Sequence, residues 1–176
     1  MTVAVRRPST VRLLCLLLAV IVAFTTTSSF EAAPAEAASS TALPAKSGTG
    51  KRIVYSRVQQ RVWLVRGDDT VKRTYLVSGH RHGTLPPVGT HSVRSKSATT
   101  TSLDGRLTMK YMTRFYWAGR AWVGFHSIPV DRAGNPIQST KQLGTPLSSG
   151  CVRQAEADAR ALYDFAKVGT KVVVVK

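Results

Sequence analysis

Between residues 52 and 77 the chain alternates short runs of β-branched and aromatic residues with polar turn residues. Short runs of this kind, bounded by Gly and Asp, predict β-strands. The runs cover residues 52–56, 61–66 and 70–77, with Gly67, Asp68 and Asp69 as the turn between the last two. Because connections this short join antiparallel neighbours, we predict an antiparallel meander that begins near Lys51.

The remainder of the chain predicts further strands and one helix. After Arg153 the apolar residues fall on one helical face, namely Ala155, Ala159, Leu162 and Ala166 with Phe165 beside it. Residues 95–105 and 127–147 are predicted to be loops, and a loop as long as the second is usually functional. The strand candidates are residues 90–94, 107–112, 121–125 and the solid β-branched run 170–175. The predicted fold class is mainly β with one helix.

The N-terminus has the pattern of a secretory signal peptide. Arg6, Arg7 and Arg12 precede or border an uncharged apolar run over residues 13–24, and Ala35-Glu36-Ala37 offers a small-residue cleavage site. We therefore predict a signal peptide over residues 1–37 and an exported, extracytoplasmic protein. An uncleaved anchor is the alternative, but Thr and Ser over residues 25–29 dilute the apolar run, and a span needs about 20 mainly apolar residues.

Removal of this segment would leave one strongly basic domain. Residues 38–50 have few large apolar side chains and predict a flexible linker, whereas residues 51–176 suffice for one domain with its own core. Three of the 25 Lys and Arg and two of the nine Asp and Glu lie in residues 1–37, so the remaining net charge is +15. Such a field attracts polyanions, and anionic wall polymers and anionic lipid are the ones available to an exported bacterial protein. Nucleic acid is not expected, because the basic residues are spread along the domain rather than gathered with stacking aromatics.

Cys151 is the only cysteine that would remain once Cys15 is removed with the signal peptide. An unpaired cysteine in an oxidising compartment is buried and inert, forms an intermolecular bridge, or is catalytic. Gly150 permits a tight backbone approach, and the helix predicted to follow would direct its N-terminal dipole at the sulfur. Backbone N–H groups around residues 149–151 would then receive a developing oxyanion. These features favour acyl transfer by a thiol.

Such a reaction needs a base, and the candidates are His80, His82, His91 and His126. His126 ends a predicted strand and opens the long loop that leads to the cysteine. Its neighbour Ser127 is positioned to orient the imidazole by its carbonyl or its hydroxyl. The other three histidines lack carboxylates or cysteines nearby, so we expect them on the surface and expect no metal site.

These segments resemble the L,D-transpeptidase catalytic domain, the YkuD-like family of exported bacterial proteins. The resemblance covers about residues 51–176 and implies a β-sandwich-like, mainly β fold with one helix after the cysteine. Two positions depart from the family pattern, since Ser149 stands in place of a second His and Pro86 in place of a Thr. The residues that carry this resemblance are 124–127, 143–153 and 157–163, with further similarity over 77–79, 86–93 and 169–175.

The resemblance implies a wall enzyme that acts on peptidoglycan stem peptides. Cys151 would be the nucleophile, His126 the general base and Ser127 the residue that orients it. The oxyanion or substrate would contact Gly150, Ser149 and Arg153, the last of them through a substrate carboxylate. In the family reaction the thiolate attacks the diamino-acid carbonyl of a tetrapeptide stem, releases D-alanine and passes the acyl group to an amine, which makes a 3→3 cross-link. We expect a monomer that uses no cofactor.

Two other functions remain open at this point. A non-catalytic domain that docks on anionic wall polymers would explain the basic charge and leave Cys151 inert. An L,D-carboxypeptidase would form the same thioester and pass it to water. Papain-like hydrolases fit less well because their Cys precedes their His, and sortases fit less well because their Arg lies farther from the Cys than Arg153 does.

Overall fold

The computed structural model describes Met1 and residues 41–176. The predicted signal peptide, with Cys15 and the Ala35-Glu36-Ala37 cleavage site, lies outside the described residues except for Met1. Within the described part of the chain, no helix is long and apolar enough to cross a membrane.

Five strands form the first sheet, in the order β3-β2-β1-β9-β4. The predicted meander is confirmed, because β1 pairs with β2 and β2 with β3, all antiparallel. The C-terminal run is confirmed as a buried strand, and it lies between β1, to which it is parallel, and β4, to which it is antiparallel. The strands are β1 (Arg52–Ser56), β2 (Arg61–Val65), β3 (Val71–Leu76), β4 (Gly89–Ser92) and β9 (Lys171–Val175).

Four strands form the second sheet, in the order β5-β6-β7-β8. They are β5 (Ser95–Thr101), β6 (Thr108–Trp117), β7 (Trp122–Ser127) and β8 (Val152–Gln154). The polar loop predicted over residues 95–105 is wrong, since residues 95–101 pair with β6 along an edge of this sheet. An edge strand with no residue in the core carries no apolar alternation, and its Thr residues have high β-propensity. The three-residue β8, which lies parallel to β7, was not predicted.

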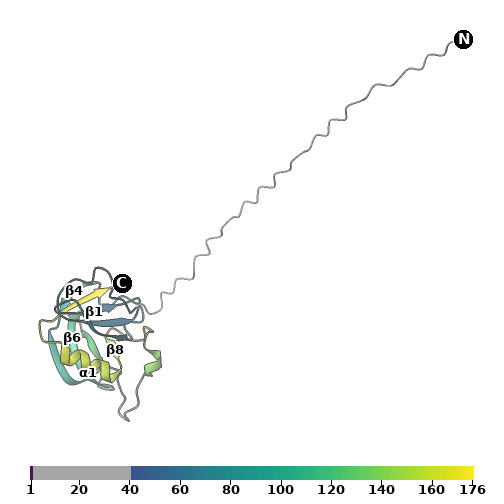
Figure 1. The fold of residues 1–176 in the computed structure, drawn as a ribbon. Helices are drawn as coiled ribbons and strands as arrows, with labels where there is room; N and C mark the ends of the chain where they lie inside the picture. Colours follow the sequence, from purple (N-terminus) through teal and green to yellow (C-terminus); the bar gives the residue numbers. More distant parts are fainter. Residues whose placement is uncertain (2–40) are drawn as a thin grey trace. The chain divides into compact units, whose positions relative to one another are not determined.

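The core lies between the two sheets and the helix α1 (Glu156–Phe165). In Figure 1, β1 and β4 lie in one layer, and β6 and β8 lie in the other with α1 alongside them. The helix was predicted from its apolar face, and Ala159, Leu162 and Phe165 are buried as that face requires. Lys96 of β5 donates to the carbonyls of Tyr163 and Ala166, which satisfies the end of the helix.

Residues 41–50 lie against the outer face of the first sheet, although a flexible linker was expected over residues 38–50. Leu43 packs on a second apolar cluster that contains Val54, Trp63, Val65 and Val173. The indole N–H of Trp63 donates to the carbonyl of Thr41 (2.8 Å). The few apolar residues of this segment therefore suffice to hold it, because the sheet presents an apolar surface to them.

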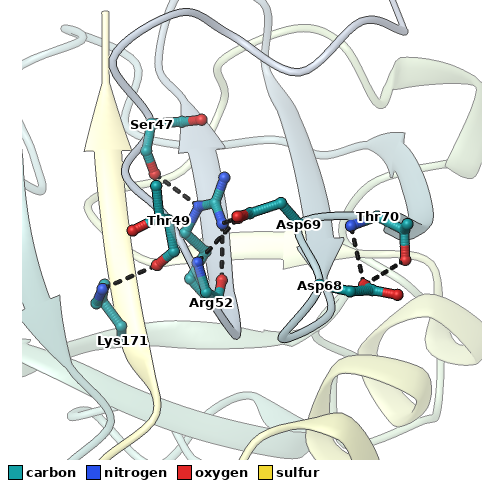
Figure 2. Close-up of polar contacts among 8 residues, drawn as sticks. Ser47, Thr49, Arg52, Asp68, Asp69, Thr70 and Lys171 are labelled. Atoms are coloured by element: carbon teal, nitrogen blue, oxygen red, sulfur yellow. Dashed lines mark hydrogen bonds and ion pairs between the residues drawn. The ribbon is translucent and has the colours of Figure 1, made fainter.

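A buried arginine fastens the same segment at its other end. The guanidinium of Arg52 donates to the carbonyls of Ser47 and Gly50, both at 2.7 Å, and pairs with the carboxylate of Asp69. Figure 2 shows this cluster, with Asp68 bonded to Thr70 beside it. The ion pair holds the β2–β3 turn and residues 47–50 on the end of β1.

Residues 128–151 connect β7 to β8 and are ordered by contacts with both sheets. Val130 bridges to Thr108 and Pro136, and the amide of Gly144 donates to the carbonyl of Val77. A short 3-10 helix, η1 (Thr140–Gln142), lies in the middle. The predicted long loop is thus a positioned segment that brings residues 148–151 back to the second sheet.

Candidate active site

The outer face of the second sheet carries the predicted site residues. Val123, Phe125 and Val152 point into the core, and since successive strand residues alternate between faces, Gly124 and His126 of β7 point outward. By the same alternation Cys151 and Arg153 flank Val152 on the outward side. Cys151, His126 and Arg153 together line a cleft of about 910 Å³, so the fold brings these three predicted residues into one site.

Strand register places the cysteine and the histidine as diagonal neighbours. Val152 pairs with Phe125 and Arg153 pairs with His126. Cys151 therefore lies one strand across from His126 and two residues along. With strands about 4.8 Å apart and a rise of about 3.3 Å per residue, their Cα atoms are about 8 Å apart, a span that the two side chains can close.

The imidazole of His126 is buried, at 3% exposed, and held in one orientation. Its Nδ1 lies 2.6 Å from the carbonyl oxygen of Ser127. Since a carbonyl only accepts, Nδ1 carries the proton and Nε2 is left as an acceptor. Burial lowers the pKa of His126 to about 4, against the opposing effect of the hydrogen bond that the ring donates to the Ser127 carbonyl. The ring is therefore neutral at neutral pH.

Ser127 acts on the histidine through its backbone and not through its side chain. Its hydroxyl accepts the amide N–H of Lys110 on β6 (2.9 Å), and the residue is 4% exposed. Of the two routes predicted from the sequence, the structure contains the one through the carbonyl.

Cys151 is half-buried, and its thiol lies 3.6 Å from the carbonyl of Trp122, to which it donates. Burial raises the pKa of the thiol, against smaller lowering effects of the Gly124 amide, Arg114 and Arg153. The helix-dipole effect predicted for this sulfur is wrong. Helix α1 begins only after β8, and three strand residues advance the chain about 10 Å, so the helix N-terminus does not meet the thiol.

Ser148 organises the turn that carries the cysteine, and the sequence did not single it out. It is 2% exposed, its Oγ accepts the Gly150 amide (3.1 Å), and the same hydroxyl donates to the carbonyl of Cys151 (2.5 Å). Its backbone pairs with that of Gly79 and Arg81. The local signal was available, because Ser often accepts the amide two residues on.

Of the backbone N–H groups of residues 149–151, which were expected to receive an oxyanion, one is engaged within the turn. The Gly150 amide, which was expected to contact the oxyanion, donates to Ser148 Oγ instead. Gly150 has φ 156°, a value that favours glycine, so its role is to let the turn form. The amides of Ser149 and Cys151 have no acceptor among the described residues, so they are the candidate oxyanion donors in this turn.

The two other predicted contacts lie on either side of the turn. Arg153 donates to the side-chain carbonyl of Gln138 (3.1 Å), a buried residue of the β7–β8 connection. Ser149 is exposed at the cleft, and its hydroxyl accepts a long contact from Arg81 (3.4 Å). Both side chains remain within reach of a bound molecule.

The three remaining histidines are distributed over two places. The ring centroids of His80 and His82 are 5.4 Å apart, whereas the ring of His91 packs on those of Phe115 and Tyr116. Within the described residues, no group of three His, Cys, Asp or Glu side chains is placed to hold a metal ion.

A known family shares this fold and sequence. The family model of the YkuD L,D-transpeptidase catalytic domain matches residues 50–174. The chain belongs to this family. The match includes every strand except the last residue of β9, together with the whole cleft described above, and the mainly β architecture with one helix is that of an L,D-transpeptidase domain.

Solved structures of L,D-transpeptidases are similar to this chain. One is LdtMt1 in complex with imipenem, with TM-score 0.59 and 25% identity over 73% of this chain and 60% of that one. An L,D-transpeptidase from Mycobacterium smegmatis has TM-score 0.58 and 21% identity over 73% and 60% of the two chains. A fused Zn-dependent amidase/peptidase/peptidoglycan-binding protein from Clostridium acetobutylicum has TM-score 0.56 and 26% identity over 73% and 54%. The YkuD domain of this chain thus spans 54–60% of these three chains. No curated protein matches the chain.

Proposed function

We propose that this protein is a peptidoglycan L,D-transpeptidase in which Cys151 is the nucleophile and His126 the general base. The observation that carries the proposal is their arrangement on one cleft face. The Nδ1–H of His126 is committed to the Ser127 carbonyl, so its Nε2 accepts a proton on the side of the cleft. A thiol and a free imidazole nitrogen on diagonal positions are the parts that acyl transfer requires.

The reaction begins from a neutral pair. Burial raises the pKa of the thiol and lowers that of the imidazole, so the proton stays on sulfur in the empty cleft. As Sγ attacks the diamino-acid carbonyl of a tetrapeptide stem, Nε2 takes the thiol proton. The amides of Cys151 and Ser149 receive the oxyanion.

The tetrahedral intermediate collapses by breaking the C–N bond to D-alanine. The protonated His126 gives its proton to the leaving amine, and a thioester on Cys151 remains. An amine of a second stem then attacks the thioester, His126 takes the amine proton, and the sulfur leaves and recovers it. The product is a 3→3 cross-link, and the thiol is restored.

Attack by water in the second step would make the same domain an L,D-carboxypeptidase. Both outcomes use the same residues, so the acceptor decides between them. The chain contributes a net charge of +15 outside residues 1–37, which would concentrate anionic wall polymers around the domain. We place the protein outside the cytoplasm, with residues 1–37 as a signal peptide and residues 51–176 as the catalytic domain.

Intact-mass spectrometry with imipenem tests the nucleophile and the base. The unmodified protein should gain one imipenem adduct, and Cys151→Ala should gain none. His126→Gln should form the adduct about 10²- to 10⁴-fold more slowly, because it lacks the base. His91→Gln is the matched control, since His91 lies on β4 against Phe115, and its rate should equal that of the unmodified protein.

A tetrapeptide stem replaces imipenem in the second half of the experiment. Release of D-alanine with a dimeric product supports transpeptidation, whereas release with a shortened monomer supports carboxypeptidase action. If neither imipenem nor the stem ever modifies Cys151, the enzyme proposal fails, and retention of wall-polymer binding by Cys151→Ala would favour the non-catalytic domain.

A further inference from the structure

Arg114 of β6 lines the same cleft as the thiol and the imidazole. It follows Thr113 and precedes Phe115, both buried, and Phe115 belongs to the core. The side chain of Arg114 therefore points to the outward face, as those of His126 and Cys151 do. No step described so far uses it.

Strand register places Arg114 and Cys151 on opposite sides of a glycine. Arg114 pairs with Gly124. Phe125 pairs with Val152. Gly124 precedes Phe125 and Cys151 precedes Val152, so Gly124 and Cys151 lie opposite each other. Arg114, a residue without a side chain and Cys151 therefore form one row across β6, β7 and the start of β8.

Three reactive or charged residues of this region, Arg114, His126 and Cys151, line the same cleft. His126 lies two residues beyond Gly124 on the same face of β7, diagonal to both ends of the row. The methyl of Met112 fills the space over the glycine, since a Cβ at position 124 would lie 2.9 Å from it, and Met112 forms an apolar floor of the cleft. The cleft over Met112 thus has Cys151 on one side, Arg114 on the other and His126 between them.

Arg114 has no carboxylate partner in the described part of the chain. Its guanidinium is held by neutral hydroxyls of β5, those of Ser97 (2.8 Å) and Thr100 (3.1 Å). The carboxylates of the described residues are engaged elsewhere: Asp68 with Thr70, Asp69 with Arg52, Asp104 with Arg106, Asp131 with Asn135, Glu156 with Lys110, Asp158 with Arg73 and Asp164 with Arg160. A cation positioned by neutral acceptors at a cleft wall is suited to an anion that arrives from outside.

The donor proposed above brings a carboxylate to this place. When Sγ attacks the scissile carbonyl, the leaving amine must face His126, and the carboxylate of that terminal residue follows within one residue, less than about 3.8 Å further along the chain. Cys151, His126 and Arg114 line the cleft over Met112 in the same order. The methyl of the leaving residue would then meet the apolar floor.

We propose that the part of the cleft over Met112, between Cys151 and Arg114, is the subsite for the leaving residue, and that Arg114 binds its terminal carboxylate. Arg114 is therefore a specificity residue that selects donors ending in a free acid one residue beyond the attacked carbonyl. This inference rests on the proposed transpeptidase function. Arg153 lies beside His126, with which it pairs on β8, and remains for a different substrate group.

Paired donors that differ only at the terminus test this subsite. A tetrapeptide that ends in D-alanine is compared with the same peptide ending in D-alaninamide, and kcat/KM is measured from release of the terminal residue. The protein should prefer the acid about 10- to 100-fold, the value of a charge-assisted hydrogen bond. Arg114→Gln should lower kcat/KM for the acid and leave kcat/KM for the amide unchanged, so that the preference for the acid falls below about threefold. Arg114→Lys should recover part of it.

Arg106→Gln is the matched control, because Arg106 is an exposed arginine of the same β5–β6 hairpin and is paired only with Asp104. It should keep the full preference. The subsite is contradicted if the unmodified protein shows no preference, if Arg114→Gln keeps it, or if that variant loses acid and amide equally, as a residue that only activates the thiol would. Binding of both peptides to Cys151→Ala, measured by calorimetry, gives the same comparison without turnover. A preference there would uphold the subsite even if acyl transfer itself failed.

Discussion

At the scale of single residues, burial sets the chemistry of the cleft. The buried imidazole of His126 and the half-buried thiol of Cys151 both shift towards their neutral forms, the first by a pKa lowered to about 4 and the second by a raised pKa. A preformed thiolate–imidazolium pair is therefore disfavoured in the empty site. The proton has to move during attack, and a base with one defined tautomer matters more than a strong base.

The pH dependence of alkylation checks this state of the thiol. Because the pKa of Cys151 is raised above its ordinary value, the thiolate fraction grows only as the pH passes that raised value. The rate of reaction with iodoacetamide should thus keep rising above pH ~8.5, the ordinary thiol value. A rate plateau already reached below pH 7 would reveal a preformed thiolate and contradict the neutral pair.

Ser148 offers a second prediction at this scale. Ser148→Ala leaves the buried Gly150 amide and the Cys151 carbonyl without the hydroxyl between them. We expect a loss of about 1–3 kcal/mol in unfolding free energy and slower formation of the imipenem adduct, because the turn that presents the sulfur loosens. Ser149→Ala, at the exposed neighbour, should change the unfolding free energy by less than about 0.5 kcal/mol. Chemical denaturation of both variants measures the difference, and equal stability would contradict the role of Ser148.

At the scale of elements, the site depends on the close approach of β6 and β7. A Cβ at Gly124 would lie 2.6 Å from the backbone oxygen of Thr113 and 2.9 Å from the methyl of Met112. Contacts this short do not occur between a real Cβ and a backbone oxygen. The glycine therefore sets how closely the strands approach, and it makes room for the Met112 methyl between Arg114 and Cys151.

Gly124→Ala should destabilise the domain by about 1–3 kcal/mol through overpacking and should also lower acylation by imipenem. Gly67→Ala is the control, because nothing lies within 4 Å of a Cβ there. Its unfolding free energy should stay within about 0.5 kcal/mol of that of the unmodified protein. A Gly124→Ala variant that unfolds and reacts as the unmodified protein does would show that β7 can shift to make room.

At the scale of the whole described domain, the first sheet has a covered outer face. Residues 41–50 cover the cluster around Trp63 and supply two of the acceptors of the buried Arg52. Without them an apolar surface meets water and a buried cation loses partners. We therefore expect residues 41–50 to contribute to the stability of the domain, although the family model matches only from residue 50.

Two truncated chains, one beginning at Thr41 and one at Lys51, test this contribution. The shorter chain should be less stable by about 2 kcal/mol or more, since an unsatisfied buried group alone costs about 1–3 kcal/mol, and its thermal unfolding should occur several degrees lower. Asp69→Asn in the longer chain removes only the ion pair with Arg52. The midpoint of its thermal unfolding should lie between those of the two truncated chains. Equal midpoints for both chains would mean that residues 41–50 contribute nothing to folding.

The local sequence pattern alone was enough to predict much of the secondary structure and the two main candidate residues. The meander, the buried C-terminal strand, the amphipathic helix and the candidates Cys151 and His126 follow from side-chain periodicity and from the rarity of the residues themselves, which are properties of adjacent positions. Periodicity missed β5 and β8, because an edge strand outside the core and a three-residue strand carry no such signal.

Only the tertiary structure decided which distant residues meet. The pairing of β8 beside β7 sets Cys151 diagonal to His126, and the pairing of β6 with β7 sets Arg114 across Gly124 from the thiol. These arrangements depend on register between strands far apart in the chain, and register is set by backbone ladders and core packing, which no short stretch of sequence contains.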